Sequence, residues 1–219
     1  MAFSTEWEKI YQNNEQISIW PWSNCVSLCH RYGNLHEGMK VLELGCGAGA
    51  NIPFFVQQKA AYYAVDGSAT MVEKLKKKFA PCDVQIAQVD FTRDFHWTES
   101  FDLIIDRAAV THNSTADIEM VLVKIRAALA PRGRFIGMDW FSMRYDAFRM
   151  DSANQIDPHT RIFKDGFFAG MGKVHFADRE HLQDLFRGFR FLYLDEKVDF
   201  VHLPEKMTRA AWDFVVEAE

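Results

Sequence analysis

The chain has 219 residues, and 48% of them are hydrophobic, including 19 phenylalanines. This is enough apolar material to fill the core of one domain, and it excludes a disordered chain. The net charge is −5 and the lysines and arginines are scattered, which argues against nucleic acid or an acidic membrane as a partner. Residues 1–10 lack the apolar stretch of a secretory signal, and no apolar run reaches the ~18 residues of a membrane span. We therefore expect a cytoplasmic, single-domain protein without a membrane span.

The four cysteines do not have the spacing of a zinc site. Cys25 and Cys29 share one face of a predicted helix, Cys46 lies in a glycine-rich loop, and Cys82 is distant. We interpret Cys25 and Cys29 as packed thiols in a reducing compartment. Because no cluster of His, Cys or carboxylate residues has metal-ligand spacing, we predict no metal site.

The first 39 residues predict a helical cap that precedes the main fold. Ser4 or Thr5 is the expected N-cap of a short helix that continues through Tyr11. Ser23 caps a second predicted helix, which ends near Gly33.

From residue 40 onward, strands and helices alternate with short connections. Strands are predicted at 40–44, 61–65, 83–88, 101–105 and 133–138, and helices at 50–58, 69–79 and 115–129. Such alternation is typical of a parallel sheet that is covered by helices on both faces. A tight turn at Pro131-Arg132-Gly133 is expected to lead into the strand at 133–138.

The alternation stops at about residue 140. The segment 140–177 is rich in phenylalanine and glycine, and we interpret it as a cap over the carboxyl edge of the sheet, not as a separate domain. A helix at 178–186 and a strand at 189–198 follow, and the apolar run 211–216 is predicted to be an edge strand. Asp139 and Trp140 end the strand before the cap, so we expect both to face the crevice.

A glycine-rich loop follows the first predicted strand. The strand at 40–44 suits a buried parallel strand, and Gly45, Gly47 and Gly49 come directly after it. Glycines permit positive φ and let a ligand approach the bare backbone. Asp66 ends the next strand, where a carboxylate suits the diol of a ribose. These features predict a nucleotide crevice, but they fit the dinucleotide fingerprint as well as other nucleotide sites.

Two later pairs of residues help to identify which nucleotide the crevice binds. Asp90 and Phe91 follow the third strand, where a carboxylate beside an aromatic ring suits the amino group and the face of adenine. Asp106 and Arg107 end the fourth strand at the crevice. A surface ion pair worth under ~1 kcal/mol is the alternative interpretation of this second pair.

In order and spacing, these motifs resemble those of the class I S-adenosylmethionine (SAM)-dependent methyltransferases. The matching segments are 43–49, 65–71, 90–91, 101–104 and 129–135, and the resemblance is strong over roughly residues 38 to 140 and loose elsewhere. It implies an α/β fold with a doubly wound, mostly parallel seven-stranded sheet, N-terminal helices and a cap insertion after the fifth strand. The tail from Thr208 would supply the one antiparallel strand near the sheet edge. The implied single methyltransferase domain, 1–219, divides into a helical cap (1–39), a SAM-binding core (40–139), a cap insertion (140–177) and the end of the sheet (178–219).

The resemblance also implies a cofactor, SAM, with S-adenosylhomocysteine (SAH) as its product, and a set of residues around it. By position, the backbone of Gly45, Cys46 and Gly47 approaches the methionine moiety, Glu43 orients its amino group, Asp66 holds the ribose with Gly67 and Met71 nearby, Asp90 and Phe91 address adenine, and Arg107 lines the methionine end. An aromatic residue of the N-terminal helices often closes over the cofactor in such enzymes. Tyr11 and Trp20 are the candidates, with core packing as the alternative.

His112 is the candidate general base, because it leaves the fourth strand just beyond the expected cofactor site. A structural histidine that bonds to backbone is the alternative. The aromatic-rich cap favours an enclosed pocket for a small-molecule acceptor over a groove for a polymer. The blocks 19–23 and 50–55 are similar to bacterial enzymes that act on metabolites or surface-glycan precursors.

Two other functions fit part of the sequence. An NAD(P)-dependent oxidoreductase is supported by the glycine loop and Asp66, but the chain lacks an evident Tyr-x-x-x-Lys pair. A non-catalytic SAM-binding protein would keep the motifs without the chemistry. The sequence predicts neither the acceptor nor the oligomeric state.

Overall fold

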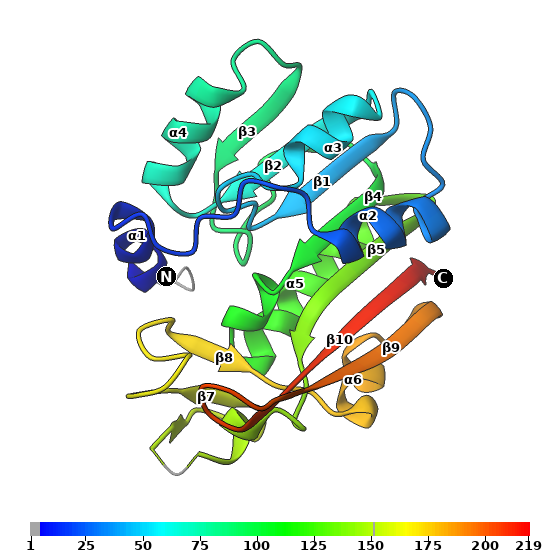
Figure 1. The fold of residues 1–219 in the computed structure, drawn as a ribbon. Coiled ribbons are helices and arrows are strands. Elements are labelled where there is room, and N and C mark those ends of the chain that lie inside the picture. The colour runs from blue at the N-terminus through cyan, green and yellow to red at the C-terminus, as the bar shows by residue number, and fades with distance from the viewer. Residues whose placement is uncertain (1–4, 151) are drawn as a thin grey trace.

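The computed structural model describes residues 5–150 and 152–219, and a seven-stranded sheet forms its centre (Figure 1). The strand order is β3 (Val84–Gln88), β2 (Ala61–Asp66), β1 (Lys40–Leu44), β4 (Phe101–Arg107), β5 (Leu129–Phe141), β10 (Met207–Ala218) and β9 (Phe189–Val201). The first five strands in this order run parallel, and β10 is antiparallel to both of its neighbours. The predicted mostly parallel, seven-stranded sheet is therefore confirmed.

Helices cover both faces of the sheet, as the alternation predicted. On one face, α2 (Ser23–Tyr32), α3 (Ile52–Gln57) and α4 (Ala69–Lys78) share one apolar core with the strands. On the other face, α5 (Thr115–Ala128) and α6 (Arg179–Leu185) share a second core. Ser68 caps α4 by accepting the Met71 N–H, and Ser114 forms a capping box with Asp117 at the start of α5. The prediction that Ser23 caps the second helix is wrong, because Ser23 is the first helical residue of α2 and Trp22 occupies the N-cap position without a side-chain hydrogen bond.

The last strand is not at the edge of the sheet, so that prediction is wrong. Strand β10 lies between β5 and β9, and β9 forms the edge. Val215 packs into one core while Phe214 and Val216 pack into the other. Three consecutive apolar residues that pack alternately into two cores are typical of an interior strand, which is buried on both faces. The edge strand β9 instead carries charged residues such as Lys197, which discourage pairing with another chain.

The predicted turn at Pro131-Arg132-Gly133 is an irregularity within β5. Leu129 pairs with Phe101, and the next paired residues are Arg134 and Leu103, so the intervening residues of β5 bulge out of the ladder. Arg132 has a φ of 64°. The strand is consequently longer than the predicted 133–138.

Segment 140–177 forms a small structure of its own below the main sheet. It contains the 3₁₀ helix η2 (Asp146–Arg149) and a three-stranded sheet of β6 (Asn154–Gln155), β7 (Thr160–Ile162) and β8 (Lys173–His175). A third apolar core, which includes Phe163, Phe168 and Phe176, fills this cap.

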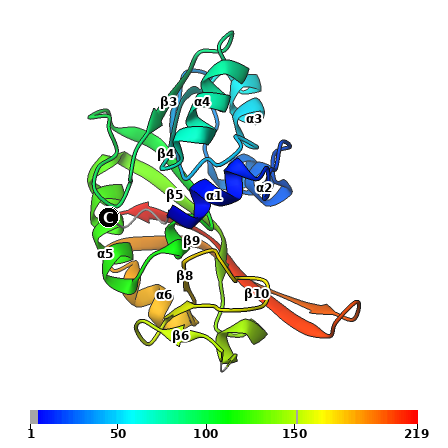
Figure 2. The same ribbon diagram turned by 90° about the vertical axis from the view of Figure 1, so that its left-hand side faces the viewer.

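Helix α1 (Thr5–Gln12) lies between α4 and β8 (Figure 2). It begins at Thr5, and the alternative cap Ser4 lies outside the described residues. Among those residues, no helix is both long and apolar enough to cross a membrane.

Candidate functional site

One large cavity opens at the carboxyl ends of the parallel strands, and its volume is about 710 Å³. Its walls are the glycine loop after β1, the ends of β2, β4 and β5, the segment after β3, α1 with the chain that follows it, and the cap. Carboxyl ends of parallel strands are where open α/β sheets bind their ligands. The volume lies in the range of pockets for small molecules and cofactors, roughly 300–1,000 Å³.

The glycine loop has the conformation that its sequence predicts. Gly45 and Gly47 have φ values of 63° and 50°, in the left-handed region. A Cβ on Gly45 would collide with the side chain of Ala109, and one on Gly47 would lie 2.9 Å from the Tyr11 hydroxyl. Larger residues would therefore both strain the loop and fill the cavity.

Asp66 lies at the end of β2 and holds the glycine loop in place. One carboxylate oxygen accepts the Gly47 N–H and the other the Ser68 N–H, each at 2.8 Å. Burial raises the pKa of Asp66 to about 6, and the two backbone donors oppose that rise. Each carboxylate oxygen has capacity for a second hydrogen bond, so the residue that positions the loop can also receive hydroxyl groups of a ligand.

Glu43 is a second buried carboxylate, at the end of β1. It accepts a hydrogen bond from the Asn51 amide at 2.7 Å and a short one from the Tyr62 hydroxyl. Burial raises the pKa of Glu43 to about 7, although these two donors favour the charged form. A cationic group in the cavity would stabilise the carboxylate further. Neither Asn51 nor Tyr62 was identified as part of the site from the sequence.

Arg107 lies at the end of β4 and forms the cationic part of the wall. Its Nε is 2.7 Å from a carboxylate oxygen of Asp139, and its guanidinium stacks 3.3 Å from the ring centroid of Trp22. Asp139 also binds Lys197, which bridges to Asp213. The expectation that Asp139 faces the crevice is met, and its pairing compensates the charge of Arg107.

Trp140 and Asp106, both expected at the crevice, do not line the cavity. Trp140 is fully buried and donates its indole N–H to Asp106 at 2.6 Å. Asp106 also accepts the backbone N–H groups of Ala109 and Val110. It therefore fixes the turn that leaves β4, which leads to His112.

His112 ends the 3₁₀ helix η1 (Val110–His112) and lines the cavity. Its Nδ1 lies 2.9 Å from the Lys173 carbonyl oxygen, and its ring packs edge-on against Trp7 with centroids 4.9 Å apart. Burial lowers the pKa of His112 to about 4, with the carbonyls of Lys173 and Met171 opposing that shift. The imidazole is therefore neutral at physiological pH.

The charged groups of the wall are mostly acidic. Among the described lining residues, Glu43, Asp66, Asp90 and Asp139 are carboxylates, and Arg107 is the one lysine or arginine. Such a wall suits a cationic ligand and disfavours the pyrophosphate of a dinucleotide, which requires donors and positive charge.

Comparison with known proteins agrees with this geometry. The family described as "Methyltransferase domain" matches residues 41–133. A curated relative, a cypemycin N-terminal methyltransferase from Streptomyces, is 35% identical over 68 residues, which are 31% of this chain and 27% of that protein. A SAM-dependent methyltransferase from Anabaena variabilis superposes with a TM-score of 0.69 at 16% identity, covering 100% of this chain and 94% of the other. Residues 41–133 therefore match a methyltransferase domain, and the chain as a whole has the fold of solved SAM-dependent methyltransferases.

The chain spans about a quarter of the curated relative that it matches. A chain from Rhodobacter sphaeroides that is named for zinc-dependent alcohol dehydrogenases has a TM-score of 0.70 at 14% identity and covers 100% of both chains. At that identity the likeness concerns the fold alone. Among the described residues, no group of three or more His, Cys, Asp or Glu side chains could hold a metal ion.

SAM, the cofactor of these methyltransferases, fits the residues of the cavity. It carries a sulfonium and an ammonium cation, and the buried carboxylates of Glu43 and Asp66 supply opposite charge. The glycine loop keeps open the space that Cβ atoms at Gly45 and Gly47 would occupy. Together with Cys46 and Gly67, Asp90 and Phe91 line the same cavity, as the resemblance implied.

Two of the residues expected around the cofactor, Trp20 and Met71, do not line the cavity. Trp20 is 76% exposed, because the chain between α1 and α2 turns its indole toward solvent. Met71 is only 2% exposed, but it lies in α4 and packs into the apolar interior. Tyr11, by contrast, is buried at the cavity beside Gly47. Of the two candidate aromatic covers, Tyr11 lines the cavity and Trp20 does not.

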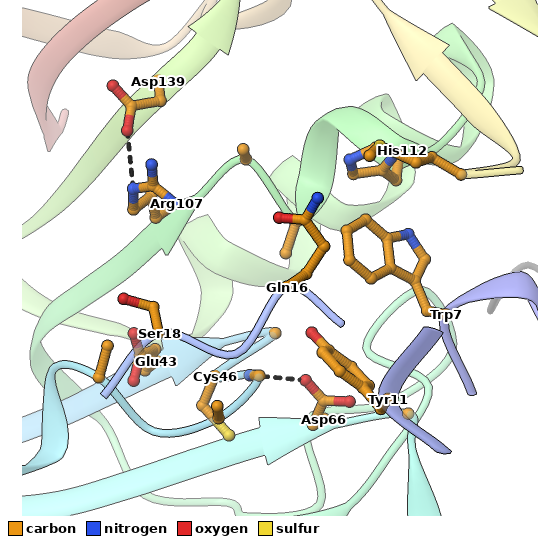
Figure 3. A pocket seen from close by; sticks show the side chains of 18 of the residues that line it. Trp7, Tyr11, Gln16, Ser18, Glu43, Cys46, Asp66, Arg107, His112 and Asp139 are labelled. Atoms are coloured by element: carbon orange, nitrogen blue, oxygen red, sulfur yellow. Dashed lines mark hydrogen bonds and ion pairs between the residues drawn. The ribbon is translucent and has the colours of Figure 1, made fainter. Parts of the chain in front are cut away.

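Sequence reasoning missed the residues that close the cavity. Trp7 precedes Tyr11 by one helical turn, and that spacing could have placed both on one face of α1. Phe168 and Met171 come from the cap, where no local pattern marks them as part of a site. Figure 3 shows the rings of Trp7 and His112 on the opposite side of the pocket from the Arg107–Asp139 pair.

Proposed function

We propose that this protein transfers the methyl group of SAM to a small-molecule acceptor in the cytoplasm. The observation that carries the proposal is a single cavity with two chemically different halves. The glycine-loop half comprises Glu43, residues 45–47, Asp66 and Asp90-Phe91. The aromatic half comprises Trp7, His112, Phe141, Phe168 and Met171. One half suits the cofactor, and the other leaves room for an acceptor that α1 and the cap enclose.

When bound, SAM supplies a methyl group that its sulfonium already activates. The protein therefore has to align the acceptor with that group and exclude water. Glu43 and Asp66 would hold the methionine and ribose parts, and Asp90 with Phe91 would hold the adenine. Trp7 and Tyr11 cover the cavity from α1, so the reacting atoms are shielded from solvent. Aromatic faces also stabilise a nearby cation.

Two kinds of small acceptor follow from the sequence, a metabolite and a surface-glycan precursor. The hydroxyl groups of a sugar each need a polar partner when they are buried. Apart from the amides of Gln16 and Asn113, the side chains of the aromatic half are rings and a thioether. It therefore favours an apolar metabolite.

Binding and turnover assays test the proposal. Calorimetry should show SAH binding to the folded protein, and incubation with SAM and a metabolite panel should release SAH together with a methylated product. NAD binding without SAH binding would instead support an oxidoreductase. Tight SAH binding with no methylation across a broad panel would support a non-catalytic SAM-binding protein.

A further inference from the structure

The aromatic half of the cavity narrows the class of acceptor. We propose that the acceptor is a planar, uncharged molecule that is methylated on a hydroxyl oxygen, and that His112 receives the hydroxyl proton. This inference rests on the proposed methyl transfer and specifies the substrate of that same site.

The shape of the aromatic half suits a flat molecule. Phe141 and Phe168 pack edge to face with ring centroids 4.9 Å apart, and Phe141 also meets the His112 ring edge-on at 5.9 Å. Trp7 packs edge-on against the same His112 ring, with centroids 4.9 Å apart. These rings come from α1, η1, β5 and the cap, so the tertiary fold brings them together. A planar guest gains both apolar burial and aromatic contacts from such walls.

The aromatic half also lacks a charge that could pair with a charged acceptor. Among the described lining residues, the carboxylates and Arg107 lie in the segments at the ends of the sheet strands. Arg107 and Asp139 neutralise each other across 2.7 Å. A carboxylate on the acceptor would lose its water without gaining a counter-charge, which is costly in an apolar pocket. An ammonium would find aromatic faces in this half but no carboxylate with which to form an ion pair.

The hydrogen bond of His112 determines which ring nitrogen can act. The Lys173 carbonyl can only accept, so in the neutral ring Nδ1 carries the proton and Nε2 carries the lone pair. Burial lowers the pKa of this histidine to about 4. A hydroxyl becomes strongly acidic as its oxygen is alkylated, and even so weak a base then takes its proton. An alkylammonium with a pKa of about 10.4, like that of lysine, would keep its proton and could not attack.

The transfer can be written with all atoms and electrons accounted for. A lone pair of the hydroxyl oxygen forms the new bond to the methyl carbon. The bond between that carbon and sulfur breaks, and its electron pair passes to sulfur, which leaves neutral SAH. The hydroxyl proton passes to Nε2 of His112 and later to water.

Three probes of similar size but different chemistry test the acceptor class. 2-Naphthol is planar, uncharged and carries a hydroxyl, 2-naphthylmethylamine is planar but cationic near neutral pH, and glucose is uncharged but rich in hydroxyls. Calorimetry on the protein saturated with SAH measures binding of each probe, and mass spectrometry after incubation with SAM measures methylation. We expect 2-naphthol alone to bind and to be methylated. A peptide with a free N-terminus adds a fourth arm, because the curated relative is named for N-terminal methylation.

The role of His112 is tested by His112→Ala and by His112→Gln, whose amide retains a donor for the Lys173 carbonyl. Loss of a general base should lower turnover of 2-naphthol about 10²- to 10⁴-fold, while binding of SAH and of 2-naphthol stays close to that of the wild type. His30→Ala is the matched control, since His30 also packs edge-on against an aromatic ring, Phe54, but lies outside the cavity. It should leave turnover unchanged.

The outcomes separate this inference from the proposed function. Failure of the folded protein to bind SAH contradicts the proposed function itself. If SAH binds but 2-naphthol neither binds nor is methylated, or if the amine, the peptide or glucose is methylated instead, the acceptor class is wrong. If His112→Gln turns over 2-naphthol at the wild-type rate, the assignment of His112 is wrong.

Discussion

Replacing Asp66 with alanine should weaken SAH binding by roughly 10- to 150-fold. A hydrogen bond to a charged group contributes about 1.5–3 kcal/mol, and each 1.4 kcal/mol corresponds to about tenfold in affinity. Asp66 is 4% exposed, so water does not easily replace its carboxylate. The lower limit corresponds to the loss of one weak bond to the ribose, and the upper limit to the loss of one strong bond.

The same substitution should lower the free energy of unfolding. The N–H groups of Gly47 and Ser68 would lose their acceptors, at about 1–3 kcal/mol for each donor that water does not reach. Asp102→Ala is a matched control, because Asp102 accepts the Lys40 N–H at 2.8 Å but lies outside the cavity. We expect this control to lose stability without losing SAH affinity.

Calorimetry of the wild type and both variants, together with urea unfolding to verify that each is folded, measures the two effects. Wild-type affinity should also fall as the pH drops below about 6, because burial raises the pKa of Asp66 to about 6 and the protonated carboxyl loses its charge. The reasoning is refuted if folded Asp66→Ala binds SAH as the wild type does. It is refuted equally if Asp102→Ala weakens binding to the same extent.

Three further predictions concern stability and the cover of the cavity. Burial and the neighbouring His181 lower the pKa of His175 to about 3, below its ordinary value of 6.5. The unfolded chain therefore takes up this proton first, and the free energy of unfolding should fall as the pH drops from 6.5 toward 3. Urea unfolding across that range should show a shallower loss for His175→Gln, and an equal slope for the variant and the wild type would contradict the assignment. Gly137→Ala places a methyl group against a buried ring of β10 and should lower the unfolding free energy by about 1–3 kcal/mol, and a melting temperature equal to that of the wild type would contradict this packing. Tyr11→Ala should weaken SAH binding by roughly 0.5–1.5 kcal/mol through the lost aromatic contact. Trp20→Ala, at a residue that is 76% exposed, should leave SAH affinity unchanged in calorimetry. A loss of affinity in Trp20→Ala but not in Tyr11→Ala would instead identify Trp20 as the residue that covers the cofactor.

The sequence by itself determined the part of the cavity that is formed by residues at the ends of individual strands. A buried parallel strand ends where its apolar run ends, and the next residue must then stand at the carboxyl edge of the sheet. Asp66, Asp90 and Arg107 were therefore placed at the crevice from their positions at strand ends, whereas Glu43, inside its strand, was placed there by the methyltransferase resemblance. All four line the cavity. The glycine loop was also predicted from the sequence, because alternating glycines after a strand indicate positive φ and close packing. The structure has both at Gly45, where φ is positive and a Cβ would collide with the Ala109 side chain.

The tertiary structure alone decided the other half of the site and the order of the last strands. Trp7 packs against the His112 ring, and the Lys173 carbonyl lies within hydrogen-bond distance of Nδ1 of the same ring. These residues are so far apart in the sequence that no helix or strand periodicity relates them. Whether an aromatic residue points inward also depends on the path of the chain around it, which is why Trp20 faces solvent. Strand β10 is interior because β9 pairs along its far side. Local propensity and strand ends act within a few residues, whereas these contacts exist only once distant segments have packed.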